Sequence, residues 1–102
     1  MKNQKHLNMR GFLSFLILHE LNKKPLCGDE LSEKIGKRKG SKLTPGTIYP
    51  TLKRLKRLNL VRMKQTGRKK NYFLTKSGKN ELKITYRIFN DLFLGLKNKI
   101  KK

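Results

Sequence analysis

The sequence predicts a mainly α-helical domain with a small β-hairpin. Apolar residues recur every three or four positions in four separate segments, which is the spacing of amphipathic helices. Between the third and fourth segments, two short runs with apolar and aromatic residues flank Gly67, which is the pattern of a hairpin. A length of 102 residues accommodates one domain with a small core.

The composition is strongly basic. Lys and Arg number 27 against 6 Asp and Glu, which gives a formal net charge of +21. Such a charge in a short chain opposes compaction, so it indicates a polyanionic partner, with DNA or RNA first and an anionic membrane surface second. No apolar run approaches the roughly 20 residues of a bilayer span, and the polar start lacks a signal-cleavage pattern, so no membrane insertion is expected.

The single cysteine, Cys27, cannot form an internal disulfide, which fits a reducing cytoplasm. Together with His6 and His19 it lacks the spacing of a zinc site, so neither a metal nor a cofactor is expected. The sequence also contains no nucleophile–base pair, no acid pair in a catalytic context and no cofactor loop. These features argue against an enzyme.

Residues 1–8 are expected to form a flexible basic arm, followed by a first helix over residues 9–21. One apolar row of this helix consists of Leu13, Ile17 and Leu21. Phe12 and Phe15 begin a second row on another side. A helix that is apolar on two sides must be covered on both. In so short a chain, the second cover is expected to be another copy of the protein.

After a break at residues 22–25, Leu26 and Cys27 form either a short strand or a segment packed beneath the next helix. That second helix is expected over residues 28–37. Its start carries half of all the acids in the chain, namely Asp29, Glu30 and Glu33. Carboxylates at this position offset the positive end of the helix dipole. Their expected role is therefore structural.

The third predicted helix, over residues 44–58, has Thr44 as a side-chain N-cap and Pro45 at its first position. Its apolar stripe consists of Ile48, Leu52, Leu55 and Leu58. The opposite face carries Thr47, Pro50, Lys53, Arg54 and Arg57, with no acid in the segment. Solvated faces usually mix charges, so this face fits a DNA groove better than an ordinary solvent-exposed face does.

Two features precede or interrupt this third helix. The basic loop at residues 36–42 lacks a nucleotide-binding signature, and its cations, with Lys42 among them, are expected to contact backbone phosphates. Pro50 removes one helical hydrogen bond. Either the helix begins near Tyr49, or the distortion is tolerated with Gly46 easing the fit. The second interpretation is favoured.

Asn59 is expected to close this helix in a left-handed conformation. Strands are then predicted at residues 60–65 and 71–74, joined by a turn over residues 66–70 with Gly67 as its hinge. The turn carries Arg68, Lys69 and Lys70. Three consecutive cations at a hairpin tip are either simply solvated or, beside a basic helix, suited to contact a nucleic-acid strand.

Thr75 is a suitable N-cap for the last helix, predicted over residues 76–99. Heptad spacing relates Leu82, Tyr86, Phe89, Phe93, Leu96 and Ile100. This stripe exceeds what one small domain can cover, so residues 76–102 are expected to dimerise, with contacts to the first helix. The alternative is a helix lying on a membrane surface.

The order of these elements is that of a winged helix-turn-helix, expected over residues 9–75. Residues 44–55, Thr-Pro-Gly-Thr-Ile-Tyr-Pro-Thr-Leu-Lys-Arg-Leu, resemble the recognition-helix motif of PadR-like transcriptional regulators, commonly Ser-Pro-Gly-Thr-Leu-Tyr-Pro-Ala-Leu-x-Arg-Leu. Residues 72–78, Tyr-Phe-Leu-Thr-Lys-Ser-Gly, are similar to the family's Tyr-x-Leu-Thr-x-x-Gly. Residues 26–31 correspond to its Leu-His-Gly-Tyr-Glu-Leu, with Cys27 and Asp29 in place of the usual His and Tyr.

The resemblance implies a homodimeric DNA-binding repressor, located in the cytoplasm on the nucleoid, with helix 44–58 in the major groove and wing 66–71 on the backbone. The expected DNA contacts are Lys42, Thr44, Thr47, Tyr49, Pro50, Lys53, Arg54, Arg57, Arg68, Lys69 and Lys70. The expected dimer contacts are Phe12, Phe15, Leu82, Tyr86, Phe89, Phe93 and Leu96. A small aromatic effector at the dimer interface is a further expectation. The alternative is a general, architectural DNA-binding protein of the same fold.

Overall fold

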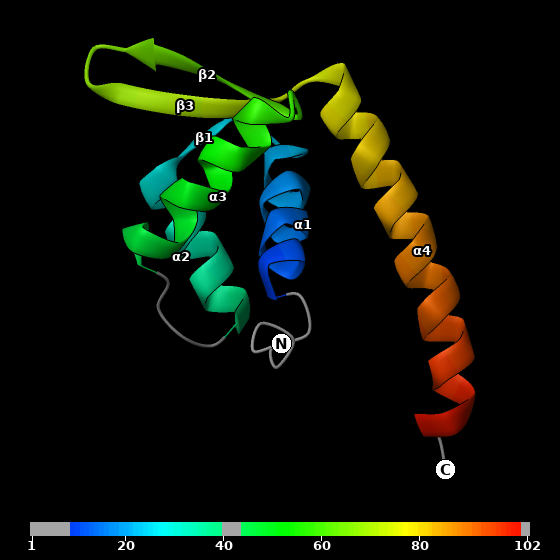
Figure 1. Ribbon diagram of the computed structural model, residues 1–102. Coiled ribbons are helices and arrows are strands. Elements are labelled where there is room, and N and C mark those ends of the chain that lie inside the picture. The colour runs from blue at the N-terminus through cyan, green and yellow to red at the C-terminus, as the bar shows by residue number, and fades with distance from the viewer. Residues whose placement is uncertain (1–8, 40–43, 101–102) are drawn as a thin grey trace, which may run out of the picture.

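A computed structural model describes residues 9–39 and 44–100 (Figure 1). The elements are α1 (Met9–Leu21), β1 (Leu26–Cys27), α2 (Gly28–Lys39), α3 (Pro45–Arg57), β2 (Val61–Thr66), β3 (Lys69–Leu74) and α4 (Lys76–Ile100). Four helices and one small antiparallel sheet confirm the predicted fold class. The predicted arm at residues 1–8 and the predicted contact Lys42 lie outside the described residues.

The sheet has three strands in the order β1-β3-β2, so Leu26 and Cys27 do form a strand. Leu26 pairs with Tyr72 of β3, which ties the start of α2 to the hairpin. The hairpin is tighter than predicted, because Thr66 pairs with Lys69 and only two residues form the turn. Gly67 adopts a φ of 63°, which a glycine accepts without strain at the first position of such a turn. Lys69 therefore lies in β3 and not in the turn.

The core lies where α1, α2 and α3 meet beneath the sheet (Figure 1). Its largest fully buried side chains are Ile17, Leu26, Leu31, Ile35, Ile48, Leu52, Leu55, Val61 and Leu82. The apolar stripe of α3 is thus buried as predicted, except at its end. Leu58 is 53% exposed because it lies at the C-cap, where the chain turns away from the helix axis.

The junction after α3 is closed by backbone hydrogen bonds. The Leu60 N–H donates to the Leu55 carbonyl at 3.0 Å and the Asn59 N–H donates to the Lys56 carbonyl at 2.9 Å. Asn59 has a φ of 63°, which confirms the predicted left-handed cap. This pair of bonds is the Schellman arrangement, and it satisfies carbonyls that the end of a helix otherwise leaves free.

The start of α4 is fixed against that same junction. The Thr75 hydroxyl accepts a hydrogen bond from the Gly78 N–H at 2.9 Å, which confirms Thr75 as the N-cap, and donates to the Asn59 carbonyl at 2.7 Å. A Cβ on Gly78 would lie 2.1 Å from the Leu60 carbonyl oxygen. A glycine is therefore required for α4 to approach the end of α3 this closely.

From this junction α4 runs antiparallel to α1, on the opposite side of the molecule from the hairpin tip (Figure 1). Leu82 near its start is only 1% exposed and belongs to the core of its own chain. Its predicted place in a dimer interface is therefore wrong, because one chain alone already covers it. No helix in the described part of the chain is long and apolar enough to cross a membrane.

Candidate nucleic-acid interface

The exposed face of α3 is formed as the sequence predicts. Thr47, Pro50, Lys53 and Arg57 are all exposed, and α3 contains no acid. The helix runs from Pro45 through Pro50 without a break, so the distortion at Pro50 is tolerated. A continuous helix with its apolar side buried leaves this cationic side free for a partner.

The first turn of α3 differs from the prediction at Thr44. Its side chain makes no capping bond to a backbone N–H. Instead its carbonyl accepts from the N–H groups of Thr47 and Ile48, at 3.0 and 3.2 Å, and its hydroxyl lies 3.3 Å from the hydroxyl of Thr47. The two hydroxyls thus form an exposed polar pair at the helix start, where hydrogen-bond donors face an approaching anion.

Arg54 does not belong to the exposed face. Its guanidinium donates to the Ser14 hydroxyl of α1 at 2.9 Å, and the residue is half-buried. The prediction that Arg54 contacts DNA is therefore corrected: the position lies at the edge of the stripe that packs on α1. In this structure Arg54 fixes α3 against α1.

Tyr49 lies at the boundary between α3 and α2. A Cβ at Gly28 would lie 2.4 Å from the Tyr49 hydroxyl oxygen, so the tyrosine ring packs where α2 has no side chain. Burial raises the pKa of the Tyr49 hydroxyl, and the negative charge of Asp29 raises it further. The hydroxyl therefore stays protonated at neutral pH and can donate a hydrogen bond.

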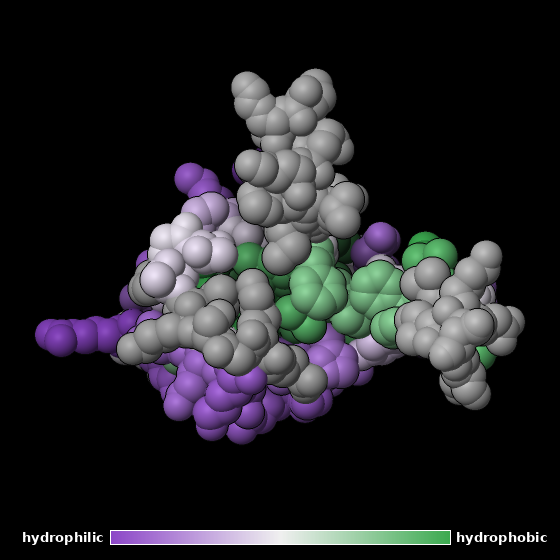
Figure 2. Space-filling model, turned by 90° about the horizontal axis from the view of Figure 1, so that it is seen from below, coloured by the Kyte–Doolittle hydropathy of each residue, from purple (hydrophilic) through white to green (hydrophobic). Residues whose placement is uncertain are grey.

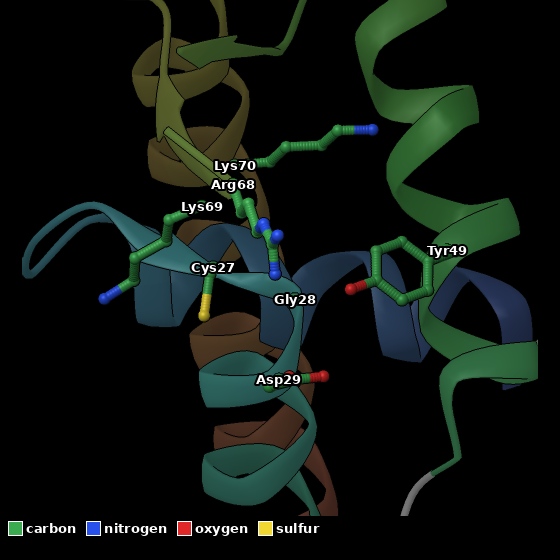
Figure 3. Close-up of a pocket in the computed structure, with 7 residues that line it drawn as sticks. All are labelled: Cys27, Gly28, Asp29, Tyr49, Arg68, Lys69 and Lys70. Carbon is green, nitrogen blue, oxygen red and sulfur yellow. The ribbon is translucent and has the colours of Figure 1, made fainter. Parts of the chain in front are cut away.

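A cavity of about 390 Å³ separates α3 from the wing, which we define as β2, β3 and their turn (Figure 3). It is lined by Cys27, Gly28, Asp29, Tyr49, Arg68, Lys69 and Lys70. In Figure 3 the Lys70 side chain extends toward α3, while that of Lys69 points away from Tyr49. The three wing cations and Tyr49, which are predicted DNA contacts, thus line one cavity. Asp29 places a carboxylate at the same cavity, which the prediction of DNA contacts did not include.

Glu30 of α2 contacts both β1 and β3 beside this cavity. Its carboxylate accepts a hydrogen bond from the Cys27 N–H at 2.9 Å and lies 3.7 Å from the Lys69 ammonium. The bond to Cys27 lowers the pKa of the Glu30 carboxyl, and the Lys69 charge contributes in the same direction. This confirms a structural role for Glu30. It also means that Lys69 is partly neutralised, whereas no ion pair of Arg68 or Lys70 is found within the described residues.

The predicted dimer contacts divide into two groups. Phe15 of α1 stacks edge-on against Tyr86 and Phe89 of α4, with ring centroids 5.6 and 4.7 Å apart. These side chains join α1 to α4 within one chain, and the Tyr86 hydroxyl also shares a 2.5 Å hydrogen bond with His19. Phe12 and Phe93 are instead largely exposed, at 43% and 65%. Leu96 belongs to α4, but its side chain is not among those that the structure describes.

The structure adds an apolar row that the predicted interface omitted. Ile84, Ile88 and Leu92 follow one another at four-residue spacing along α4 and are 51%, 51% and 56% exposed. Viewed from the end where α1 begins, apolar surface continues from the body of the molecule toward α4 (Figure 2). In the sequence, Ile88 and Leu92 widen the apolar stripe of this helix, and the same four-residue spacing adds Ile84.

The fold is shared with solved structures. A family model described as the transcriptional regulator PadR-like family matches residues 17–84. The chain belongs to that family. The proteins of this family are described as transcriptional regulators. Within the described residues, no group of three His, Cys, Asp or Glu side chains is placed to hold a metal ion. A search of curated proteins gave no significant match.

Solved structures of other PadR-like proteins are similar. A PadR-like transcription factor from Bacteroides fragilis is 26% identical with a TM-score of 0.82, and the alignment covers 94% of this chain and 97% of that one. A PadR family regulator from Clostridium difficile R20291 is 28% identical with a TM-score of 0.75, covering 87% and 98%. Bacillus subtilis PadR, solved in complex with operator DNA, is 30% identical with a TM-score of 0.65, covering 74% of this chain and 45% of that one.

Proposed function

We propose that this PadR-like protein is a homodimeric regulator that represses transcription by binding duplex DNA, with α3 in the major groove and the wing on the phosphate backbone. The observation that carries the proposal is the exposed, acid-free face of α3, which lies across the cavity from the wing cations. A helix of this width fits the major groove, and flanking cations fit the adjoining phosphates. The operator complex of Bacillus subtilis PadR supports the same use of the fold.

The residues divide by role. Thr47, Lys53 and Arg57 face outward from α3 and are the candidates for contacts within the groove. Tyr49 and Lys70 face the cavity and are the candidates for phosphate contacts, which add affinity without sequence information. Arg54 positions α3 through Ser14 and is not among the groove contacts.

Dimerisation is proposed through the exposed apolar residues of α4 together with Phe12 of α1. An apolar row of this length on a soluble domain indicates a partner surface. Two copies related by a twofold axis would place two α3 helices on half-sites about one helical turn, roughly 34 Å, apart. Such a dimer would act on the nucleoid in the cytoplasm, and a small aromatic effector between the copies would meet the exposed rings of Phe12 and Phe93.

The test is selection of bound sequences from random duplexes, followed by affinity measurements on the selected duplex and a scrambled one at several salt concentrations. Lys53→Gln is expected to reduce the preference for the selected duplex, by about 1–3 kcal/mol if Lys53 contacts a base edge. Lys70→Gln is expected to weaken both duplexes equally and, because the proposed dimer carries two copies of Lys70, to lower the salt slope by about 1.8. Lys34→Gln, an exposed position on α2, serves as the charge-matched control.

A second candidate function is general, architectural DNA binding, which the net charge of +21 favours. Phosphate attraction of that magnitude can dominate affinity. The same measurements separate the two functions: a small preference for the selected duplex that does not change with salt supports the architectural function and contradicts a sequence-preferring regulator.

A further inference from the structure

A second set of cations lies on α4, away from α3 and the wing. It comprises Lys76, Lys79, Lys83 and Arg87, which we call the α4 stripe. Their separations of three, four and four residues keep them on one face of a helix. All four residues are exposed. Of the two acids of α4, Glu81 falls on the opposite face of the helix, whereas Asp91 follows Arg87 at four-residue spacing and lies at the lower end of the stripe.

Within the described part of the chain, Lys76, Lys79 and Lys83 have no acid at a neighbouring position on α4, and Asp91 adjoins only Arg87. Lysines elsewhere in the molecule form ion pairs: the ammonium of Lys23 lies 3.7 Å from the Glu20 carboxylate, and that of Lys69 lies 3.7 Å from the Glu30 carboxylate. No such pair is found for any member of the stripe among the described residues. Four like charges that face solvent together repel one another, so a polyanion bound there would relieve that repulsion.

A cavity of about 280 Å³ lies at the upper end of the stripe, between the start of α4 and the end of α1. It is lined by Asn22, Lys76, Lys79, Asn80, Leu82, Lys83 and Tyr86. Three ammonium groups and two amides surround it, and no acid is among the lining residues. Ammonium and amide N–H groups are the donors that phosphate oxygens accept from. The cavity therefore suits a phosphate group that continues along the stripe.

The stripe also has the dimensions of a nucleic-acid strand. From Lys76 to Arg87 it spans eleven residues of helix, which is about 16 Å. Measured along the axis of a duplex, that length corresponds to the rise of roughly five nucleotides of one strand. Because α4 and the tip of the wing lie on opposite sides of the molecule (Figure 1), the stripe extends beyond the surface formed by α3 and the wing.

We infer that the α4 stripe binds the phosphate backbone of a second DNA duplex, so that the protein bridges two DNA segments. An anionic membrane would also attract these cations. It would need the apolar row of α4 as well, however, and that row is assigned to the partner copy under the proposed function. Bridging needs only the charges and donors of the stripe.

The test is a bridging assay. One duplex is fixed to beads and saturated with protein, and capture of a second, fluorescent duplex from solution is measured. The stripe variant Lys79→Gln/Lys83→Gln/Arg87→Gln is expected to occupy the fixed duplex within about twofold of wild type but to capture about tenfold less of the second duplex. Its salt slope for the second duplex is expected to fall by roughly 2 to 3. The control Lys24→Glu/Lys34→Gln removes the same charge from exposed positions outside α4 and outside the basic loop at residues 36–42.

Circular dichroism and thermal unfolding establish that both variants are folded. Undiminished capture by the stripe variant, or an equal loss in the control, overturns the inference. So does stripe-dependent binding to phosphatidylglycerol vesicles with unchanged capture of DNA, which would assign the stripe to membranes. Failure of the proposed function is distinguished by Lys53→Gln/Arg57→Gln, because those changes are expected to weaken the first duplex while the stripe still binds DNA.

Discussion

Helices α3 and α4 are both amphipathic, but the apolar side of α3 is buried whereas much of the apolar side of α4 is exposed. The stripe of α3 is covered by its own chain, with Ile48, Leu52 and Leu55 at most 2% exposed. Among the apolar side chains of α4 that the structure describes, only Leu82 is buried to that degree, and the row from Ile84 to Leu92 is about half exposed. The difference follows from position: α3 lies between α1, α2 and β2, whereas α4 contacts chiefly α1 and the end of β3.

The two helices therefore differ in what stabilises their positions: α3 is held by its own chain, whereas the outer row of α4 has no cover from its own chain. Burying a Leu or Ile side chain contributes about 1.5–3 kcal/mol, so the stripe of α3 makes the position of that helix a property of a single copy. The outer row of α4 contributes little until something covers it. Under the proposed function, each copy positions its own α3, and the uncovered apolar row of α4 joins two copies and so sets the spacing between their α3 helices.

The largest effect should come from the buried stripe of α3. Leu52→Ala is expected to lower the free energy of unfolding by about 2–5 kcal/mol, because it leaves a cavity where α3 meets the core. Chemical denaturation at a fixed protein concentration measures the change. Leu58→Ala is the matched control, since the same chemical change at the exposed C-cap should stay within about 0.5 kcal/mol. Similar losses at both positions would contradict the assignment of the covered stripe.

The next effect concerns the outer row of α4. Ile88→Glu is expected to raise the dimer dissociation constant about a hundredfold, because it places a charge at the centre of the proposed interface. Sedimentation velocity over a concentration series measures that constant. Asn90→Glu changes the charge equally on another face of α4 and should leave the constant within about threefold. A dimer that survives Ile88→Glu would show that the copies meet elsewhere.

The same contrast explains how much of the molecule the sequence could predict. Helical spacing located all four helices, and Asn59 and Thr75 were correctly predicted as caps because each needs only its immediate neighbours. Arg54 was misplaced because periodicity gives the face of a residue but not its partner. The partner, Ser14, lies 40 positions away in the sequence.

Leu82 shows the same limit in α4. The heptad pattern grouped it with Tyr86 and Phe89, and no local signal tells which members of a stripe a neighbouring helix will cover. The candidate DNA-binding face of α3 was predicted almost completely, since it depends on a local absence of acids. The contact between α3 and α2 was not predicted, because the packing of Tyr49 on Gly28 depends on how the two helices approach each other.

A smaller effect should come from the junction that holds α4 to the covered domain. Thr75→Ala removes the bonds to the Gly78 N–H and the Asn59 carbonyl, so it is expected to cost about 0.5–2 kcal/mol of stability. Thr75→Ser keeps the hydroxyl and should recover most of that loss. If both variants unfold alike in chemical denaturation, the methyl group and not the cap determines stability at this position.

The smallest effect concerns Glu30, whose carboxylate accepts a hydrogen bond from the Cys27 N–H at the start of α2, beside the wing. The hydrogen bond from Cys27 lowers the pKa of the folded Glu30 carboxyl below its ordinary value, so its contribution to stability is fully present above the unfolded pKa and is lost as the pH falls through the lower, folded pKa. The stability difference between wild type and Glu30→Gln should therefore be largest at neutral pH and shrink in acid. Denaturation curves between pH 7 and pH 3 measure it, with Glu33→Gln as the exposed control on the same helix. A difference that stays constant over this range would mean that the side chain stabilises α2 without its charge.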